Sequence, residues 1–374
     1  MNNVIDSLVP DNIKTLKAYK PGKPIEALIK EHGINKAIKV ASNENPLGPS
    51  PLALEAATRE LEKLHVYPDG DSHDLKEALS AHVGVSTDEL IFGAGSDELI
   101  DLIVRTFCKP GHDQILTHKY AFISYKLSAQ AHNVEFIETA VDEGYQVDLD
   151  ALLEAITPKT RVIFLANPNN PTGQHIRRHD LERFLSKLPR EVILVMDEAY
   201  YEYAIDSKGK EYPDSLTYRH ETSHPLLITL RTFSKIYGLA GLRVGYAMAD
   251  CAIVDYMNRV RRPFNINRVA QAAAVASLQD AAHVEQSRII AHQGIRTMVE
   301  VMTKLGLKAY PSLTNFTLVD LGKPVDNIYR QLLNLGIVVR PLGPWGLPDH
   351  LRISVGTSEE IDSVMTTLSK VLES

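Results

Sequence analysis

Short apolar runs alternate with amphipathic segments along the first two thirds of the chain. Each run is four to seven residues long and rich in Val, Ile and Leu: 89–92 (ELIF), 113–117 (DQILT), 134–140 (VEFIETA), 161–166 (RVIFLA), 191–197 (EVILVMD) and 226–232 (LLITLRT). The last three runs are typical of strands buried on both faces of a parallel sheet. Apolar residues recur at helical spacing in the segments between them: 52–64, 72–83, 96–107 and 121–132. Strands that alternate with helices predict an α/β fold with a large, doubly wound, mostly parallel sheet.

The pattern changes after about residue 265. An Ala-rich helical stretch continues to about residue 305, and short strands and helices follow, ending in a helix over 358–372. This order predicts a smaller α+β domain at the C-terminus. A chain of 374 residues is long enough for two domains. We therefore predict an N-terminal arm and small-domain segment (1–45), a large domain (46–265) and a small domain (266–374).

Composition narrows the possible functions. The net charge is −7 and no polybasic tract occurs, which disfavours nucleic acid or a membrane surface as a partner. Two distant cysteines, no secretion signal and no apolar stretch near ~20 residues indicate a cytoplasmic protein. His175 and His179 have the spacing of a helical metal pair, but two arginines lie between them, so we expect no metal site.

Polar side chains follow the predicted buried strands. Asn170 follows strand 161–166, and Lys235 follows strand 226–232. Asp197 ends strand 191–197, and Tyr200 follows it. Ligands of open α/β sheets bind at the carboxyl ends of the strands, so these groups should share one site. The turn 93–96 (GAGS) leads from a strand into a helix, where Ser96 is a plausible N-cap.

These side chains suit an anionic, aromatic cofactor with a carbonyl group. A lysine amine can form an imine with an aldehyde, and Asp197 can keep a pyridine nitrogen protonated. A helix N-terminus binds phosphate, and the guanidinium of Arg243 is a forked phosphate donor. A lysine after a strand is usually only a solvated side chain. The prediction of a cofactor site therefore depends on Lys235 occurring together with Asn170, Asp197, Tyr200 and Arg243. The GAGS turn lacks the third glycine of a dinucleotide fingerprint.

Seven motifs occur in a familiar order. They are SNENPLGPSP (42–51), YPDG (67–70), GAGSDE (93–98), NPNNPTG (167–173), DEAY (197–200), SKIYGLAGLRVGY (234–246) and LRISVGT (351–357). Together they resemble the fold-type I aminotransferases, which depend on pyridoxal 5′-phosphate (PLP). The resemblance runs from about Tyr19 to the last helix.

The resemblance implies a role for each site residue. Lys235 is expected to form the Schiff base with PLP and to carry the proton, Asp197 to pair with the pyridine nitrogen, and Asn170 and Tyr200 to bind the ring hydroxyl. The remaining cofactor contacts are expected from the phosphate cup, from a ring stacked on the cofactor (Tyr120) and from a tyrosine that reaches the neighbouring subunit's phosphate (Tyr67). The cup comprises Ala94, Gly95, Ser234 and Arg243, and Gly93, Ser96 and Thr232 are expected to be further cofactor-binding residues. The family also implies a homodimer with shared active sites.

The same resemblance implies the substrates. The closest branch transfers the amino group of L-histidinol phosphate to 2-oxoglutarate in histidine biosynthesis. Arg352 is expected to bind the acidic end of the substrate, with Arg340, Tyr19 and Asn43 as further candidates. Three alternatives stay open on sequence: an aromatic amino-acid aminotransferase, a PLP-dependent threonine-phosphate decarboxylase, and a regulatory module of the same fold. The chain has no spare length for the DNA-binding domain that such a module usually carries.

Overall fold

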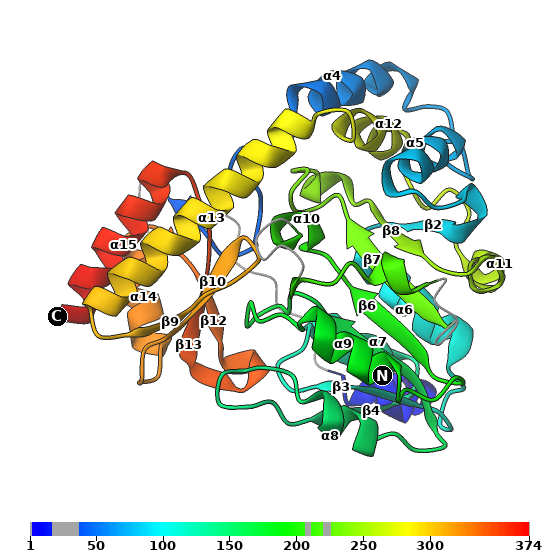
Figure 1. Ribbon diagram of the computed structural model, residues 1–374, viewed down its shortest axis with the longest axis horizontal. Helices are drawn as coiled ribbons and strands as arrows, with labels where there is room; N and C mark the ends of the chain where they lie inside the picture. Colours follow the sequence, from blue (N-terminus) through cyan, green and yellow to red (C-terminus); the bar gives the residue numbers. More distant parts are fainter. Residues whose placement is uncertain (1, 17–36, 206–210, 220–225, 374) are drawn as a thin grey trace.

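The computed structural model describes residues 2–16, 37–205, 211–219 and 226–373. Tyr19 lies outside these ranges, as does most of the predicted N-terminal arm. Figure 1 shows a large sheet with its helices and, beside it, a smaller unit that contains the C-terminus. Two helices of the arm are described, α1 (Asn2–Leu8) and α2 (Asp11–Lys14). The Asn12 side chain ties α2 to the large unit by donating to the backbone oxygens of Gln130 and Ala131.

The large sheet has seven strands within the described residues. In spatial order they are β2 (Leu90–Gly93), β8 (Gly245–Met248), β7 (Leu227–Thr232), β6 (Ile193–Asp197), β5 (Thr160–Ala166), β3 (Gln114–His118) and β4 (Glu135–Thr139). Pairing is parallel except along β8, which is antiparallel to both of its neighbours. Every residue of β6 and β7 is buried, as expected of strands covered on both faces.

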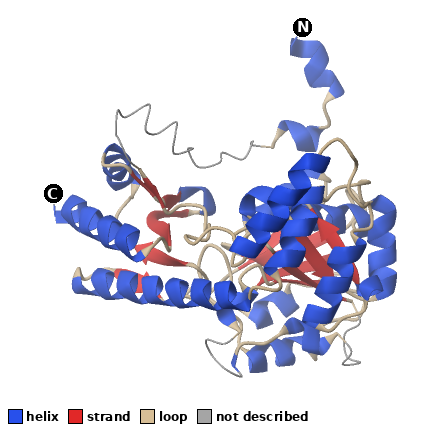
Figure 2. Ribbon diagram, turned by 90° about the horizontal axis from the view of Figure 1, so that it is seen from above, coloured by secondary structure: helices blue, strands red, loops and turns tan. Residues whose placement is uncertain are grey.

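Helices cover both faces of this sheet (Figure 2). One face packs against α6 (Ser96–Phe107), α7 (Ile123–Ala131) and α11 (Cys251–Val260). The other packs against α8 (Leu149–Glu154) and α9 (Arg178–Leu185) around β5, and against α4 (Pro51–Glu60), α5 (His73–Val83) and α12 (Arg268–Ser277) around β8. Successive side chains of β6 alternate between the two cores: Val195 faces α6 and α7, and Met196 faces α9.

The smaller unit is an antiparallel sheet with helices on it. Its strand order is β12 (Arg340–Leu342), β13 (Leu347–Ser354), β10 (Phe316–Asp320) and β9 (Lys308–Tyr310). The helices are α13 (Ala281–Lys304), α14 (Asp326–Asn334) and α15 (Ser358–Glu373). The long helix α13 runs from beside α12 to this sheet (Figure 1). A parallel pair, β1 (Ile38–Lys39) with β11 (Ile337–Val338), joins the N-terminal segment to the smaller unit.

Shorter elements connect these parts. They are α10 (Tyr201–Ala204) and the 3-10 helices Leu61–Lys63, Thr87–Glu89, Ser215–Tyr218, Ala240–Leu242 and Gly343–Trp345. No helix in the described ranges combines the length and the apolar character needed to cross a bilayer.

All six predicted strands of the large sheet are present in the structure. The sequence reading did not isolate β8 or β9, which have only four and three residues. The positions of the domain borders stay a prediction.

Candidate active site

The predicted cofactor residues meet where β5, β6 and β7 end. Because these neighbouring strands run parallel, their carboxyl ends open at the same edge of the sheet. The cavity at this edge is lined by eight of the predicted residues: Ser96, Asn170, Asp197, Tyr200, Thr232, Ser234, Lys235 and Arg243. Lys235, Asp197 and Arg243 therefore surround one cavity, as expected of residues that share one site.

Lys235 lies just after β7, with its side chain in the cavity. Burial, reinforced by the positive charge of Arg352, lowers the pKa of Lys235 to about 8. Its Nζ atom lies 5.8 Å from the centre of the Tyr200 ring. At pH 7 about a tenth of this amine is therefore uncharged, far more than for an ordinary lysine, and only the uncharged form attacks a carbonyl or accepts a proton.

Asp197 ends β6 and is buried. The Tyr125 hydroxyl donates to its Oδ2 atom at 2.7 Å, and the Ala199 N–H donates to its Oδ1 atom at 3.3 Å. Burial raises the pKa of Asp197 to about 6, although both hydrogen bonds oppose this shift. A carboxylate held in this way would pair strongly with a cationic ring nitrogen brought into the cavity.

The GAGS turn presents the N-terminus of α6 to the same cavity. Gly95 adopts a φ of +81°, and an added Cβ there would overlap the guanidinium of Arg243. Arg243 lies 3.4 Å from Ser234 Oγ through its Nη1 atom and 3.7 Å from Asp97 through its Nη2 atom. Together the turn, Ser234 and Arg243 form a concave, donor-rich surface suited to a phosphate.

Two details of this turn differ from the prediction. Ser96 is the first residue of α6, and Gly95 occupies the N-cap position without a side-chain cap. The prediction that Ser96 is the N-cap was therefore wrong. Gly95, with its positive φ, turns the chain into the helix one residue earlier. The Ala94 N–H donates to the Glu98 carboxylate, so the N–H groups of Gly95 and Ser96 are better placed for an anion.

Separate hydrogen bonds from Asn43 and Arg352 hold Tyr200 and Asn170 in the cavity. Asn43 Nδ2 donates to the Tyr200 hydroxyl at 2.8 Å, which leaves the phenolic proton of Tyr200 for another acceptor. Burial raises the pKa of Tyr200 to about 12. Arg352 Nη1 donates to Asn170 Oδ1 at 2.6 Å, so the amide nitrogen of Asn170 is the group available to a ligand.

A second cavity adjoins the first and shares Phe122, Asn170 and Lys235 with it. We call it the cationic cavity, because its lining also includes Lys39, Asn43, Arg340 and Arg352. Arg340 on β12 and Arg352 on β13 are paired across the strands. Arg352 is buried, and its Nη2 atom donates to the Ala41 carbonyl at 2.7 Å.

Tyr120 does not line the cavity, and this prediction needs correction. Its φ of +60° turns the chain, and its ring meets the Tyr145 ring edge-on at 5.6 Å, within an apolar cluster that includes Trp345. Phe122, the N-cap residue of α7, lines both cavities instead. An aromatic residue at a helix start beside a strand end was the available sequence signal.

Tyr67 lines neither of the two cavities. Tyr67 is 77% exposed, and its ring stacks on the ring of Phe264 with the centroids 4.9 Å apart. Sequence reasoning also overlooked Tyr125, the partner of Asp197, because a tyrosine inside an amphipathic helix resembles ordinary core packing.

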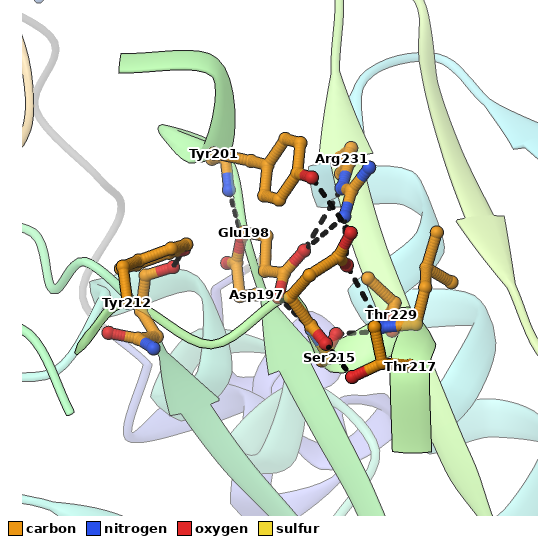
Figure 3. Close-up of polar contacts among 12 residues, drawn as sticks. Asp197, Glu198, Tyr201, Tyr212, Ser215, Thr217, Thr229 and Arg231 are labelled. Carbon is orange, nitrogen blue, oxygen red and sulfur yellow. Dashed lines mark hydrogen bonds and ion pairs between the residues drawn. The ribbon is translucent and has the colours of Figure 1, made fainter. Parts of the chain in front are cut away.

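An ion cluster begins at Glu198, the residue after Asp197, and reaches Arg231 of β7 (Figure 3). We call Glu198, Arg231 and Asp214 the scaffold ion cluster. Arg231 donates to Glu198 Oε2 at 2.8 and 2.9 Å and to Asp214 Oδ1 at 2.8 Å, and its guanidinium lies 3.3 Å from the centre of the Tyr201 ring. Burial opposes the charge on Arg231, but Glu198 and its other neighbours raise the pKa of Arg231 well above the ordinary value. The cluster joins the end of β6 to β7 and so fixes the edge that carries Asp197 and Lys235.

Fold and site together define a class of enzyme. Residues 35–368 match the family model described as aminotransferase class I and II, and the chain belongs to this PLP-dependent family. It is similar to the histidinol-phosphate aminotransferase of Anaeromyxobacter sp. (strain Fw109-5), with 43% identity over 366 residues, 98% of this chain and 99% of the relative. Histidinol-phosphate aminotransferase 2 of Pseudomonas aeruginosa is 44% identical over 368 residues, 98% of each chain.

A solved structure gives the same result. Histidinol-phosphate aminotransferase from Sinorhizobium meliloti, in complex with pyridoxal 5′-phosphate, superposes with a TM-score of 0.87 at 30% identity and covers 98% of each chain. This similarity confirms the predicted fold type and the predicted enzyme class.

Proposed function

We propose that the protein transfers the amino group of L-histidinol phosphate to 2-oxoglutarate, giving imidazole acetol phosphate and glutamate, with PLP attached to Lys235. One observation carries the proposal: the Lys235 amine lies between a phosphate-binding turn and a cavity lined by two arginines. The similarity to histidinol-phosphate aminotransferases over 98% of the chain supports this choice of substrate.

The residues of the first cavity fit PLP. The turn at Gly95, with Ser234 and Arg243, suits its phosphate, Asp197 its pyridine nitrogen, and Asn170 and Tyr200 its ring hydroxyl. Phe122 is placed to cover a ring, a role that replaces the one expected of Tyr120. When bound, the cofactor supplies an electron sink for the charge left at the substrate carbon.

The protein's own groups carry out the remaining steps. Lys235 Nζ, with its pKa lowered to about 8, accepts the proton from the substrate carbon and returns it to the cofactor side. Asp197 holds positive charge on the ring, and its hydrogen bond from Tyr125 fixes its orientation. The chain from Asn43 to Tyr200 keeps the phenol aimed into the cavity while the amine changes partners.

Arg352 and Arg340 are suited to the substrate's phosphate. Like charges opposite one another on paired strands destabilise a sheet, and an anion between them removes that cost. In the second half-reaction, the same pair would bind the α-carboxylate of 2-oxoglutarate. Both substrates would thereby place their reacting carbon next to Lys235.

A homodimer is part of the proposal. Tyr67 lies at an apolar surface that also exposes Leu61, Leu64, Val66 and Phe264. A second copy covering this surface would bring Tyr67 to the partner's phosphate site. Both cysteines, Cys108 and Cys251, are free thiols, which suits the cytoplasm that we propose as its location.

Single-turnover spectroscopy of the PLP-loaded protein tests the substrate. We expect L-histidinol phosphate to convert the cofactor to its amine form with a higher kcat/KM than phenylalanine or tyrosine. A preference for phenylalanine by about 100-fold or more, about 2.7 kcal/mol in transition-state binding, would replace histidinol phosphate with an aromatic amino acid. Release of CO₂ from threonine phosphate would indicate a decarboxylase.

A further inference from the structure

Lys39 belongs to the cationic cavity, but no step above uses it. It ends the two-residue strand β1, which pairs in parallel with β11. Backbone bonds hold the next residue on both sides: Val40 N–H donates to Val338 O at 2.8 Å, and Val40 O accepts from Ser354 N–H at 2.9 Å. The Lys39 side chain is 20% exposed, and its Nζ atom lies 2.9 Å from Glu44 Oε1. The cavity therefore has a cation on a strand that carries neither arginine.

The positions of the three cations indicate two anion sites. Arg340 and Arg352 are cross-strand neighbours on one face of the sheet, so one anionic group could bind both. Lys39 enters from a different sheet. Among the described residues that line this cavity, none is acidic. A phosphorylated amine has one anionic group, whereas a dicarboxylic acid has two, and the second would have to bind away from the arginine pair.

We propose that Lys39 binds the side-chain carboxylate of the dicarboxylate substrate, and that this carboxylate displaces Glu44 as its partner. The inference rests on the proposed function for the identity of that substrate. Glu44 is 50% exposed, and ion pairs so open to water are weak, so its replacement by a substrate carboxylate is easy. When the uncharged ring of the amino donor occupies the cavity, Lys39 stays paired with Glu44. One pocket thereby accepts two unlike substrates in turn.

The test compares Lys39→Met with the wild type, both loaded with PLP. Glutarate, a dicarboxylate without a reactive carbonyl, is titrated by calorimetry, and kcat/KM is measured for 2-oxoglutarate and for 2-oxohexanoate, which lacks the second carboxylate. We expect Lys39→Met to weaken glutarate binding about 10- to 100-fold and to lower the preference for 2-oxoglutarate over 2-oxohexanoate by a similar factor. An unchanged cofactor absorbance spectrum shows that the variant is folded and loaded.

Two matched variants sharpen the result. Lys39→Arg should restore glutarate binding to within about threefold, because it keeps the charge, and Glu44→Gln should tighten it, because the competing carboxylate is gone. Unchanged glutarate binding in Lys39→Met, or an equal loss with both oxo acids, would overturn the inference. Failure of the wild type to react with L-histidinol phosphate would instead count against the proposed function, and the glutarate comparison would still decide the role of Lys39.

Discussion

The scaffold ion cluster and the cationic cavity lie at the same edge of the large sheet but use charge in opposite ways. In the cluster, one buried guanidinium faces two carboxylates and an aromatic ring. The cavity is lined by two arginines and Lys39, with no acid among the described residues of the lining. Charges that are paired within the protein hold the backbone in place. An excess of charge of one sign instead marks a site for a ligand of the opposite charge. The comparison thus separates residues that build the site from residues that bind in it.

Removing the Lys235 amine, which lines the cationic cavity and the cavity beside it, should have the largest effect. We expect Lys235→Ala to lose roughly 10⁴-fold in turnover, because Lys235 is the one amine among the described residues that line the latter cavity. PLP should still bind through the turn at Gly95, so dialysis followed by cofactor analysis would show bound but unattached PLP. Ordinary transamination by this variant would refute the role of Lys235.

Breaking the scaffold ion cluster should affect stability more than chemistry. Arg231→Met leaves Glu198 charged and buried without its partner, which should cost about 3–5 kcal/mol of unfolding free energy. Urea unfolding of the cofactor-free protein measures this loss. The double variant Glu198→Gln/Arg231→Met should lose less unfolding free energy than Arg231→Met alone, because a glutamine in place of Glu198 carries no charge. A larger loss in the double variant would show that Glu198 and Arg231 do not stabilise each other.

Asp197→Asn tests the neighbouring acid, which lines the cavity and is not part of the scaffold ion cluster. A neutral amide cannot hold charge on the ring nitrogen, so turnover should fall about 10²- to 10³-fold with little loss of stability. Single-turnover rates and urea midpoints measured on the same preparations separate the two effects. A near-wild-type rate would show that Asp197 does not pair with the ring.

Within the cationic cavity, Arg340→Met should have a smaller effect. It removes one of two donors to the same anion, so kcat/KM for L-histidinol phosphate should fall about 10- to 100-fold while Arg352 still binds the phosphate. Arg340→Lys is the matched control and should recover part of the loss. Equal losses for donors with and without a phosphate would argue that Arg340 only supports the strand.

The last prediction concerns how pH changes the rate at which PLP attaches to Lys235. With a pKa of about 8, the fraction of uncharged Lys235 amine rises as pH increases toward 8 and levels off above it. Attachment of PLP to the cofactor-free protein, followed by absorbance, should therefore accelerate about tenfold per pH unit below 8 and reach a plateau. Acceleration that continues toward pH 10.5 would mean that burial does not shift this amine.

The sequence predicted the features that depend on periodicity and order. Continuous apolar runs identified β5, β6 and β7, and the residues that follow them meet in one cavity because parallel strands end at a common edge. Backbone turns were harder to anticipate. A left-handed residue at Tyr120 sends its ring into the apolar cluster and leaves Phe122 at the cavity, and no spacing rule anticipates a positive φ at a tyrosine.

Contacts between distant segments could not be predicted either. The Tyr125 hydroxyl reaches Asp197 across the face of the sheet, and Lys39 reaches the cationic cavity only because β1 pairs with β11. These contacts depend on how helices and strands that are distant in the sequence pack together, which cannot be predicted from the pattern of a single sequence.

The two adjacent acids at the end of β6 have different roles because successive side chains of an extended chain point to opposite sides. Asp197 points toward α7, where Tyr125 holds it, and Glu198 points to the opposite side, toward Arg231. A shift of β6 by one position would exchange the two side chains. Glu198 would then face the cavity, and Asp197 would face Arg231. An insertion or deletion of one residue in this strand should therefore abolish activity even in a chain that still folds.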